Sequence, residues 1–255
     1  MALVLNEEQR FLRQSAREFL GDNAPVASLR ALRDSRDPLG DSSQLWQQMA
    51  ELGWASSILP EESGGLAFGF TGLGLVMEEA GRTLTASPLF ASAVVGASAL
   101  LLGGSETHKQ NLLSQVAAGE LTLALALEES PHHRPTRIAT SATADGDGFL
   151  LNGCKTFVVD GHSADQLLVV ARSSGDSNGA DGLSLFLVPR DAAGVSIQRT
   201  IMADSRNAAN ITLEQVRVSA EDLVGELDHG WQVLEPVLDR GRIALSAEML
   251  GIALE

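Results

Sequence analysis

Cysteine is almost absent from this chain of 255 residues, because Cys154 is the only one. A single cysteine excludes an intrachain disulfide framework and a zinc site built from several thiolates, and it fits a reducing compartment. We therefore expect a cytoplasmic protein. The N-terminal residues also lack a basic segment followed by an apolar stretch, so they show no signal peptide.

Positive charge is scarce as well: 18 Lys and Arg stand against 33 Asp and Glu, and the formal net charge is −15. Nucleic acids and anionic membrane surfaces need clustered positive charge, so we expect neither as a partner. The most apolar run, Leu89 to Leu102, is shorter than the roughly 20 residues that span a bilayer. Because this run is rich in Ala, Gly and Ser, it predicts a buried helix and no membrane anchor.

Apolar residues up to Gly119 follow the helical period of about 3.6 residues, and this part shows no convincing strand. Asn6 and Gln9 have the spacing of a capping box, which predicts a helix start there, and Gly21 can end that helix. The Leu59 to Gly69 stretch is a loop rich in Pro and Gly. Further helices are predicted over residues 42–52, over 71–84, from 89 onward and over 105–119.

From Glu120 the apolar period falls to about 2, which is typical of half-buried strands. Asp145 to Gly148 supplies a hairpin turn, and Cys154, inside a predicted strand, is expected in the core. After Gly225 the helical pattern returns. The predicted strands are Leu121–Leu127, Ile138–Ala144, Phe149–Val159, Gln166–Arg172, Leu183–Pro189, Val195–Arg199 and Asn210–Val218.

These patterns predict an α+β fold in three parts. A helical domain is expected over residues 1–119, an antiparallel β-barrel or β-sandwich domain over 120–228, and the start of a C-terminal helical bundle over 229–255. The last helix carries an apolar stripe that includes Leu245, Met249 and Ile252. An incomplete bundle cannot cover such a stripe, so we expect a homo-oligomer or a sister subunit.

Four stretches of sequence match one known family in chain order. They are Gly53-Trp54 with LPEESGGLAFG and VMEEAGR, then GSETHKQNLLSQVAAGELTLALAL, then DGFLLNGCKTFVVDG, and finally LEQVRVSAEDLVGELDHGWQVLEPVLDRGRIALSAEMLG. Together they resemble the acyl-CoA dehydrogenases. The resemblance implies FAD, an acyl-CoA thioester substrate and an electron-transfer acceptor protein. It also implies α,β-desaturation, in which a glutamate removes the α-proton while a hydride passes to the flavin.

The stretch Glu128 to Pro135, EESPHHRP, departs from the family pattern. The matching family loop reads Thr-Glu-Pro-Gly-x-Gly-Ser-Asp and wraps the flavin and the thioester; here only Glu129 clearly agrees. The residues alone leave three readings open: a metal site at His132 and His133, an acid/base pair of Glu128 and Glu129, or a polar loop. Adjacent strand residues point to opposite sides, which favours the loop, and no metal is expected.

The resemblance assigns site residues position by position. Phe157 stands where the family usually has a Trp against the flavin, and Val159 where it has a Thr. Some family members place the glutamate that removes the α-proton at the position of Gly241, which carries no side chain here. The commoner position of that glutamate would lie beyond Glu255. No catalytic residue is therefore assigned. The expected flavin-side residues are Leu125, Leu127, Glu128, Phe157 and Val159, and the expected substrate-side residues are Asp239 and Arg242.

Three functions remain open at this stage. The chain is an FAD-dependent acyl-CoA dehydrogenase, a non-catalytic partner subunit of a heteromeric dehydrogenase with a degraded flavin site, or a binding module for acyl thioesters without redox chemistry. The lost Thr, Gly and Ser residues favour the second reading, and the family resemblance favours the first. Because several flavin contacts are missing, we expect this chain alone to bind FAD weakly or not at all.

Overall fold

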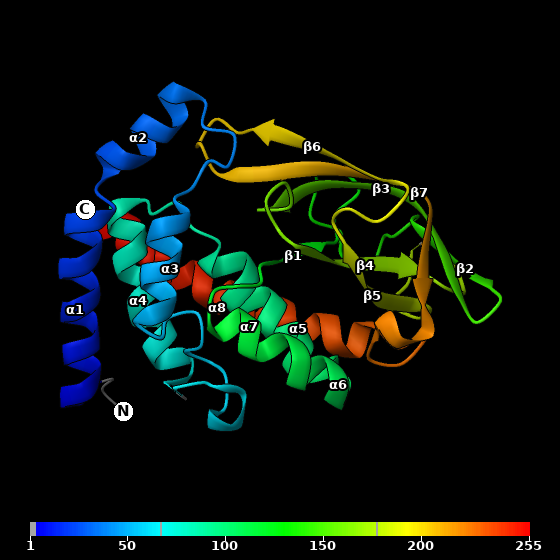
Figure 1. The fold of residues 1–255 in the computed structure, drawn as a ribbon, viewed down its shortest axis with the longest axis horizontal. Coiled ribbons are helices and arrows are strands. Elements are labelled where there is room, and N and C mark those ends of the chain that lie inside the picture. Colours follow the sequence, from blue (N-terminus) through cyan, green and yellow to red (C-terminus); the bar gives the residue numbers. More distant parts are fainter. Residues whose placement is uncertain (1–3, 67, 177) are drawn as a thin grey trace.

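The computed structural model describes residues 4–66, 68–176 and 178–255. Helices gather on one side of the molecule and strands on the other, and the last helix, α8 (Trp231–Leu254), runs from the strands back to the N-terminal helices (Figure 1). The described residues therefore contain both of the predicted kinds of structure in the predicted order. Within them, no helix combines the length and the apolar character needed to cross a membrane.

The first helix, α1, begins where the sequence predicts a cap. The Asn6 side chain accepts a hydrogen bond from the Gln9 N–H at 2.7 Å, and Gln9 returns one to the Asn6 N–H at 3.1 Å, which confirms the capping box. The run from Leu89 is buried and helical, as predicted. The helices are α1 (Glu7–Asn23), α2 (Val26–Ser35), α3 (Ser43–Glu51), α4 (Gly69–Thr83), the π-helical η2 (Leu89–Gly96), α5 (Ala97–Gly103), α6 (Glu106–His108), η3 (Lys109–Leu113) and α7 (Ser114–Ala117).

The strands form one sheet in the order β6-β7-β3-β2-β4-β5-β8, with β1 paired to β4. In the described residues this sheet is open, so of the two expected arrangements, a barrel or a sandwich, it does not form a closed barrel. The sheet is also not wholly antiparallel, because β1 and β2 both run parallel to β4. The strands are β1 (Leu123–Ala126), β2 (Ser141–Asp145), β3 (Gly148–Val159), β4 (Gln166–Arg172), β5 (Leu183–Pro189), β6 (Val195–Ile201), β7 (Asn207–Ser219) and β8 (Leu223–Val224).

Strands β1 and β2 lie along the same edge of β4, one after the other. Residues Leu123 to Ala126 pair with the first half of β4, and Ser141 pairs with its last residue, Arg172. The chain between the two strands leaves the sheet, so the predicted strand Ile138–Ala144 starts later than expected. The predicted hairpin is confirmed, since Asp145 pairs with Gly148. Cys154 is exposed, so its expected core position is wrong.

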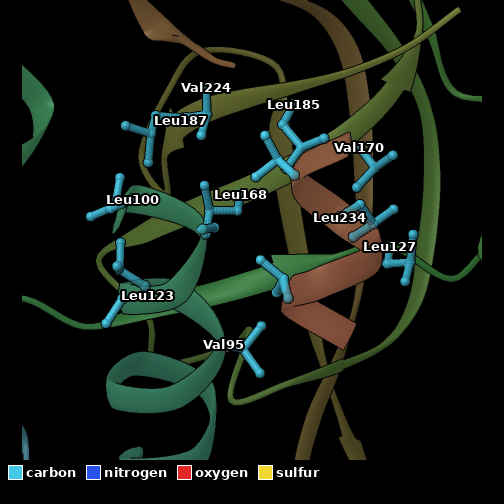
Figure 2. Close-up of a cluster of buried hydrophobic side chains, with 14 of the residues drawn as sticks. Val95, Leu100, Leu123, Leu127, Leu168, Val170, Leu185, Leu187, Val224 and Leu234 are labelled. Carbon is cyan, nitrogen blue, oxygen red and sulfur yellow. The ribbon is translucent and has the colours of Figure 1, made fainter. Parts of the chain in front are cut away.

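The largest hydrophobic cluster joins the two halves of the molecule. Figure 2 shows Leu168 and Leu185 of the sheet in the same cluster as Leu100 of α5 and Leu234 of α8. All four side chains are fully buried. Burying a Leu side chain contributes about 1.5–3 kcal/mol relative to leaving it exposed, so this cluster fixes α8 against the sheet.

Helices α4 and α8 cross so closely that glycine is required on both. A Cβ atom at Gly81 would overlap the carbonyl of Glu248, and one at Gly251 would overlap the carbonyl of Glu78. An ion pair also joins α4 to α1. Glu79, with 1% of its surface exposed, bonds Arg17 of α1 at 2.9 Å and Arg82 at 3.3 Å.

Candidate functional site

A cavity of about 390 Å³ lies between η2, β1, β3 and α8. It is lined by Leu125 and Leu127 from β1 and the residue after it, by Phe157 and Val159 from β3, and by Arg242 from α8. The sequence singles out all five of these residues. The structure thus brings together side chains that are far apart in the chain, around a space within the usual range of small-molecule pockets, about 300–1,000 Å³.

Phe157 has an unusual backbone conformation beside this cavity. Its φ angle is 51°, in the left-handed region, and its side chain is 43% exposed. The pairing of β3 with β7 shifts register between Lys155 and Val158, so the residue sits on a bulge. Left-handed φ is a true outlier for a bulky residue, and such strain gathers at functional sites. The bulge turns an aromatic ring toward the cavity instead of into the core.

Glu128 holds a histidine at the cavity wall. Its Oε1 lies 2.6 Å from Nδ1 of His133, and its Oε2 accepts a hydrogen bond from the Arg134 N–H at 3.1 Å. The imidazole of His133 lines the cavity. Glu128 is therefore next to the expected flavin side, but it acts through His133. This pair was not predicted, because it depends on the path of the loop after β1.

Glu129 turns the other way and binds a buried lysine. Nζ of Lys155 donates to Glu129 Oε1 at 2.7 Å and to the carbonyl of Leu127 at 3.1 Å. Burial is the main influence on Lys155 and lowers its pKa to about 8, although Glu129 opposes the change. Glu129 itself has a lowered pKa, because the attraction of Lys155 and several hydrogen bonds outweigh its burial.

The same carboxylate also binds the backbone just before β2. Glu129 accepts hydrogen bonds from the N–H groups of Ala139 at 2.6 Å and Thr140 at 3.0 Å, at the place where the chain rejoins β4. The two glutamates diverge, as the strand pattern predicts, and each is tied to its own partner. Sequence reasoning missed Lys155, whose signal was a lone lysine inside an otherwise apolar strand. Among the described residues, no group of three or more potential ligands is arranged to hold a metal ion.

On α8 the expected substrate residues form a pair. Nη1 of Arg242 bonds Oδ1 of Asp239 at 2.6 Å, and both side chains are largely exposed. Arg242 lines the cavity and Asp239 holds it from outside. Gly241 also faces the cavity and adds no functional group. Within the described part of the chain, His133 and Arg242 are the polar side chains on this wall, and the remaining lining is apolar.

Comparison with known families settles the relationship. Residues 6–120 match the acyl-CoA dehydrogenase N-terminal domain, and residues 124–216 match the acyl-CoA dehydrogenase middle domain. The chain belongs to the acyl-CoA dehydrogenase family. The relatives named acyl-CoA dehydrogenases are oxidoreductases. The family match covers the N-terminal helices and the sheet that carries Phe157.

Individual relatives agree with this membership. A probable acyl-CoA dehydrogenase, YngJ, of Bacillus subtilis (strain 168) is 31% identical over 261 residues, which cover 99% of this chain and 67% of the relative. A 3-(aryl)acrylate reductase of Clostridium sporogenes (strain ATCC 15579) is 30% identical over 262 residues, covering 98% of this chain and 67% of the relative. The chain therefore spans about two thirds of the length of these acyl-CoA dehydrogenase relatives.

Solved structures have the same fold. A variant of the Tcur3481-Tcur3483 steroid acyl-CoA dehydrogenase matches with a TM-score of 0.83 and 34% identity, over 97% of this chain and 63% of that one. An acyl-CoA dehydrogenase from Bacillus anthracis, complexed with FAD, matches with a TM-score of 0.84 and 24% identity, over 97% of this chain and 42% of that one. The second likeness concerns the fold alone.

The cavity suits the flavin that the family uses. Its walls are apolar around the exposed ring of Phe157, which fits a flat and largely apolar ring system. His133 and Arg242 are the side chains that can donate hydrogen bonds to polar edges. The residues present therefore fit FAD, with fewer side-chain donors than the family loop supplies.

Proposed function

We propose that this chain forms the flavin and thioester site of an acyl-CoA dehydrogenase, which desaturates an acyl-CoA thioester between its α and β carbons. The observation that carries the proposal is the convergence of Leu125, Leu127, Phe157, Val159 and Arg242 on one cavity. FAD, when bound, accepts the hydride from the β carbon. Relatives named acyl-CoA dehydrogenases support this reading over the non-catalytic partner subunit.

Each wall of the cavity has a role in this proposal. Phe157 packs its ring against the flavin, and Leu125, Leu127 and Val159 exclude water, which strengthens polar interactions inside the cavity. Arg242, held by Asp239, supplies positive charge near the path of the anionic CoA group. His133, held by Glu128, offers an imidazole nitrogen to polar atoms of a ligand. The α-proton acceptor is left unassigned, because the position of Gly241 has no side chain.

The first experiment measures FAD binding by the purified chain through quenching of flavin fluorescence. We expect weak binding, because each missing hydrogen bond costs about 0.5 to 1.5 kcal/mol and several are lost relative to the family loop. Phe157→Gly keeps the left-handed backbone without strain and removes the ring, so it should weaken binding about tenfold. Phe11→Ala is the control, since Phe11 is 77% exposed on α1.

Equal measurable affinities of all three proteins for FAD would contradict the assignment of the flavin site, and no binding at any concentration would favour the partner subunit with a degraded flavin site. A second measurement adds an acyl-CoA thioester to the FAD-loaded chain and follows the flavin absorbance.

We propose that an electron-transfer protein accepts the electrons, as the family resemblance implies. We also propose assembly with a second copy or a sister subunit, which the exposed apolar side chains of α8 support.

A further inference from the structure

A second cavity, of about 150 Å³, adjoins the first one. Phe90 and Val159 line both spaces, so the two cavities meet across these side chains. The second cavity is formed where α4, η2, the end of β3 and α8 come together. Its polar lining includes Asp160, Asp204, Arg206 and Glu248, and we call it the acidic cavity.

Asp160 is the buried group that this cavity leaves without a partner. The residue is 6% exposed, and its backbone N–H donates to the carbonyl of Asn207 at 3.1 Å. Its carboxyl group lines the acidic cavity and makes no hydrogen bond to any described residue. In the described part of the chain, the side-chain atoms that are fully enclosed without a hydrogen-bond partner do not include those of Asp160, so its carboxyl oxygens can be reached from the acidic cavity.

The surroundings of Asp160 determine its protonation. Burial, followed by repulsion from Asp41 and Glu248, raises the pKa of Asp160 to about 8, while Arg206 acts in the opposite direction. Arg206 is ion-paired with Glu248 and is therefore largely neutralised. A pKa raised in this way favours the protonated form of Asp160 at neutral pH, and the O–H of that form can donate a hydrogen bond into the acidic cavity.

These features select among possible occupants. A carboxylate would be repelled by Asp204 and Glu248, and a methyl group would leave the Asp160 O–H unpaired. A hydroxyl or ketone oxygen accepts the proton of Asp160 and brings no charge. Phe90 and Val159 line both spaces, so the far end of a ligand held in the larger cavity lies next to the acidic cavity across these two side chains.

We propose that the acidic cavity binds an uncharged oxygen group, a hydroxyl or a ketone, at the end of the acyl group that is farthest from the thioester. Asp160 is its hydrogen-bond partner, and the inference rests on the proposed thioester function. Asp160 would then be a specificity-determining residue. Asp tolerates the left-handed φ of 55° at this position, but that backbone preference does not explain an unpaired carboxyl that faces a cavity.

The test is calorimetric titration of the FAD-loaded chain at neutral pH with straight-chain acyl-CoA thioesters, each with and without a terminal hydroxyl. For the chain length that fits best, we expect the hydroxylated thioester to bind about tenfold more tightly, since one buried hydrogen bond changes affinity by about that factor. Asp160→Gly keeps the left-handed backbone and should abolish the difference. Asp160→Asn retains a donor and should keep most of it.

The outcomes separate the inference from the function on which it rests. Equal binding of both members of every pair by the unaltered chain overturns the inference and leaves the thioester function standing. Failure of every thioester to bind overturns the function, and the inference with it. If Asp160→Gly weakens both members equally, Asp160 has only a structural role. Thermal unfolding of each variant checks that the comparison is made on folded protein.

Discussion

Lys155 places a positive charge inside the sheet, where 1% of the residue remains exposed. A charge in such surroundings is tolerated only when a partner and hydrogen bonds replace the lost water. Glu129 and the carbonyl of Leu127 do this here. The pair also ties the loop that carries His133 to strand β3, so the shape of the cavity wall depends on it.

Lys155→Met leaves the half-buried Glu129 without its charge partner, and it should lower the free energy of unfolding by about 3–5 kcal/mol. The matched control is Arg217→Met, which removes an exposed ion pair with Asp145 and should cost about 0–1 kcal/mol. Urea unfolding measures both. The double variant Lys155→Met/Glu129→Leu should lose less than the sum of its single changes. If Lys155→Met and Arg217→Met lower the free energy of unfolding equally, the pair of Lys155 and Glu129 does not have the importance argued for it.

Asp160 makes stability depend on pH in a defined direction. Its pKa in the folded chain, about 8, is above the ordinary value of 3.8, so the folded state holds a proton that the unfolded state has released between these values. The contribution of Asp160 to the free energy of unfolding is therefore fully present below pH 3.8, and it is lost as the pH rises toward 8. Asp41, Arg206 and Glu248 are the charged groups that act on Asp160.

We expect Asp160→Asn to remove this pH-dependent loss. The variant should be more stable than the unaltered chain at a pH near 8, and the difference should shrink as the pH falls toward 3.8. Asp41, whose pKa is raised to about 6 mainly by burial, changes stability in the same direction in both proteins. Comparing unfolding midpoints across this range isolates Asp160. A difference that does not vary with pH would contradict the raised pKa.

Residue types predicted the cavity better than they predicted the contacts inside it. Leu125, Leu127, Phe157 and Val159 are assigned by the resemblance to the family, position by position, and the structure brings them together on one cavity. The bond between Glu128 and His133 depends on how a loop folds back, and the burial of Lys155 depends on three strands meeting. The spacing of apolar residues along the chain predicts neither the bond nor the burial. Their functional roles, and that of Asp239, remain predictions.

At the scale of elements, the crossing of α4 and α8 is the tightest helix contact described above. Gly251→Ala inserts a methyl group against the backbone of α4, and overpacking of this kind costs about 1–3 kcal/mol. Gly74→Ala is the matched control within α4, because its new Cβ would lie 3.9 Å from Ala247. There we expect a gain of up to about 1 kcal/mol from helix propensity.

Thermal unfolding distinguishes these two variants by sign: Gly251→Ala should lower the melting temperature, and Gly74→Ala should raise it. A Gly251→Ala protein as stable as the unaltered chain would mean that the helices can separate without loss. Arg82, which bonds Glu79 and Glu255, then becomes the contact to examine, because it also links α4 to the end of the chain.

Element boundaries show where periodicity is sufficient. Strands Gln166–Arg172 and Leu183–Pro189 were predicted to the residue, because each is a long apolar run with clear turns on both sides. Helix α2 (Val26–Ser35) was missed, and none of its residues is fully buried, so its apolar pattern is weak. The early end of β1 and the late start of β2 follow from their shared edge on β4, which no local pattern reports.

At the scale of the whole molecule, α8 presents apolar side chains to solvent. Met249 is 65% exposed, Ile243 is 54% exposed and Ile252 is 46% exposed. We expect the chain to associate at micromolar concentration, because an apolar face of this kind favours a partner. Met249→Lys should shift the protein toward monomer in light scattering, whereas Phe11→Ala, on α1, should not. A stable monomer for all three proteins would contradict this expectation.

The position of α8 after the whole sheet has a consequence during synthesis. While the ribosome makes strands β1 to β8, α4 already exists but lacks the helix that covers it. The face of α4 that packs on α8 must wait for α8, which follows after the whole sheet, and closing so long a stretch of chain is entropically costly. A nascent chain of this protein therefore exposes an apolar surface on α4 until α8 has been made and has docked, and it should need a chaperone during that time.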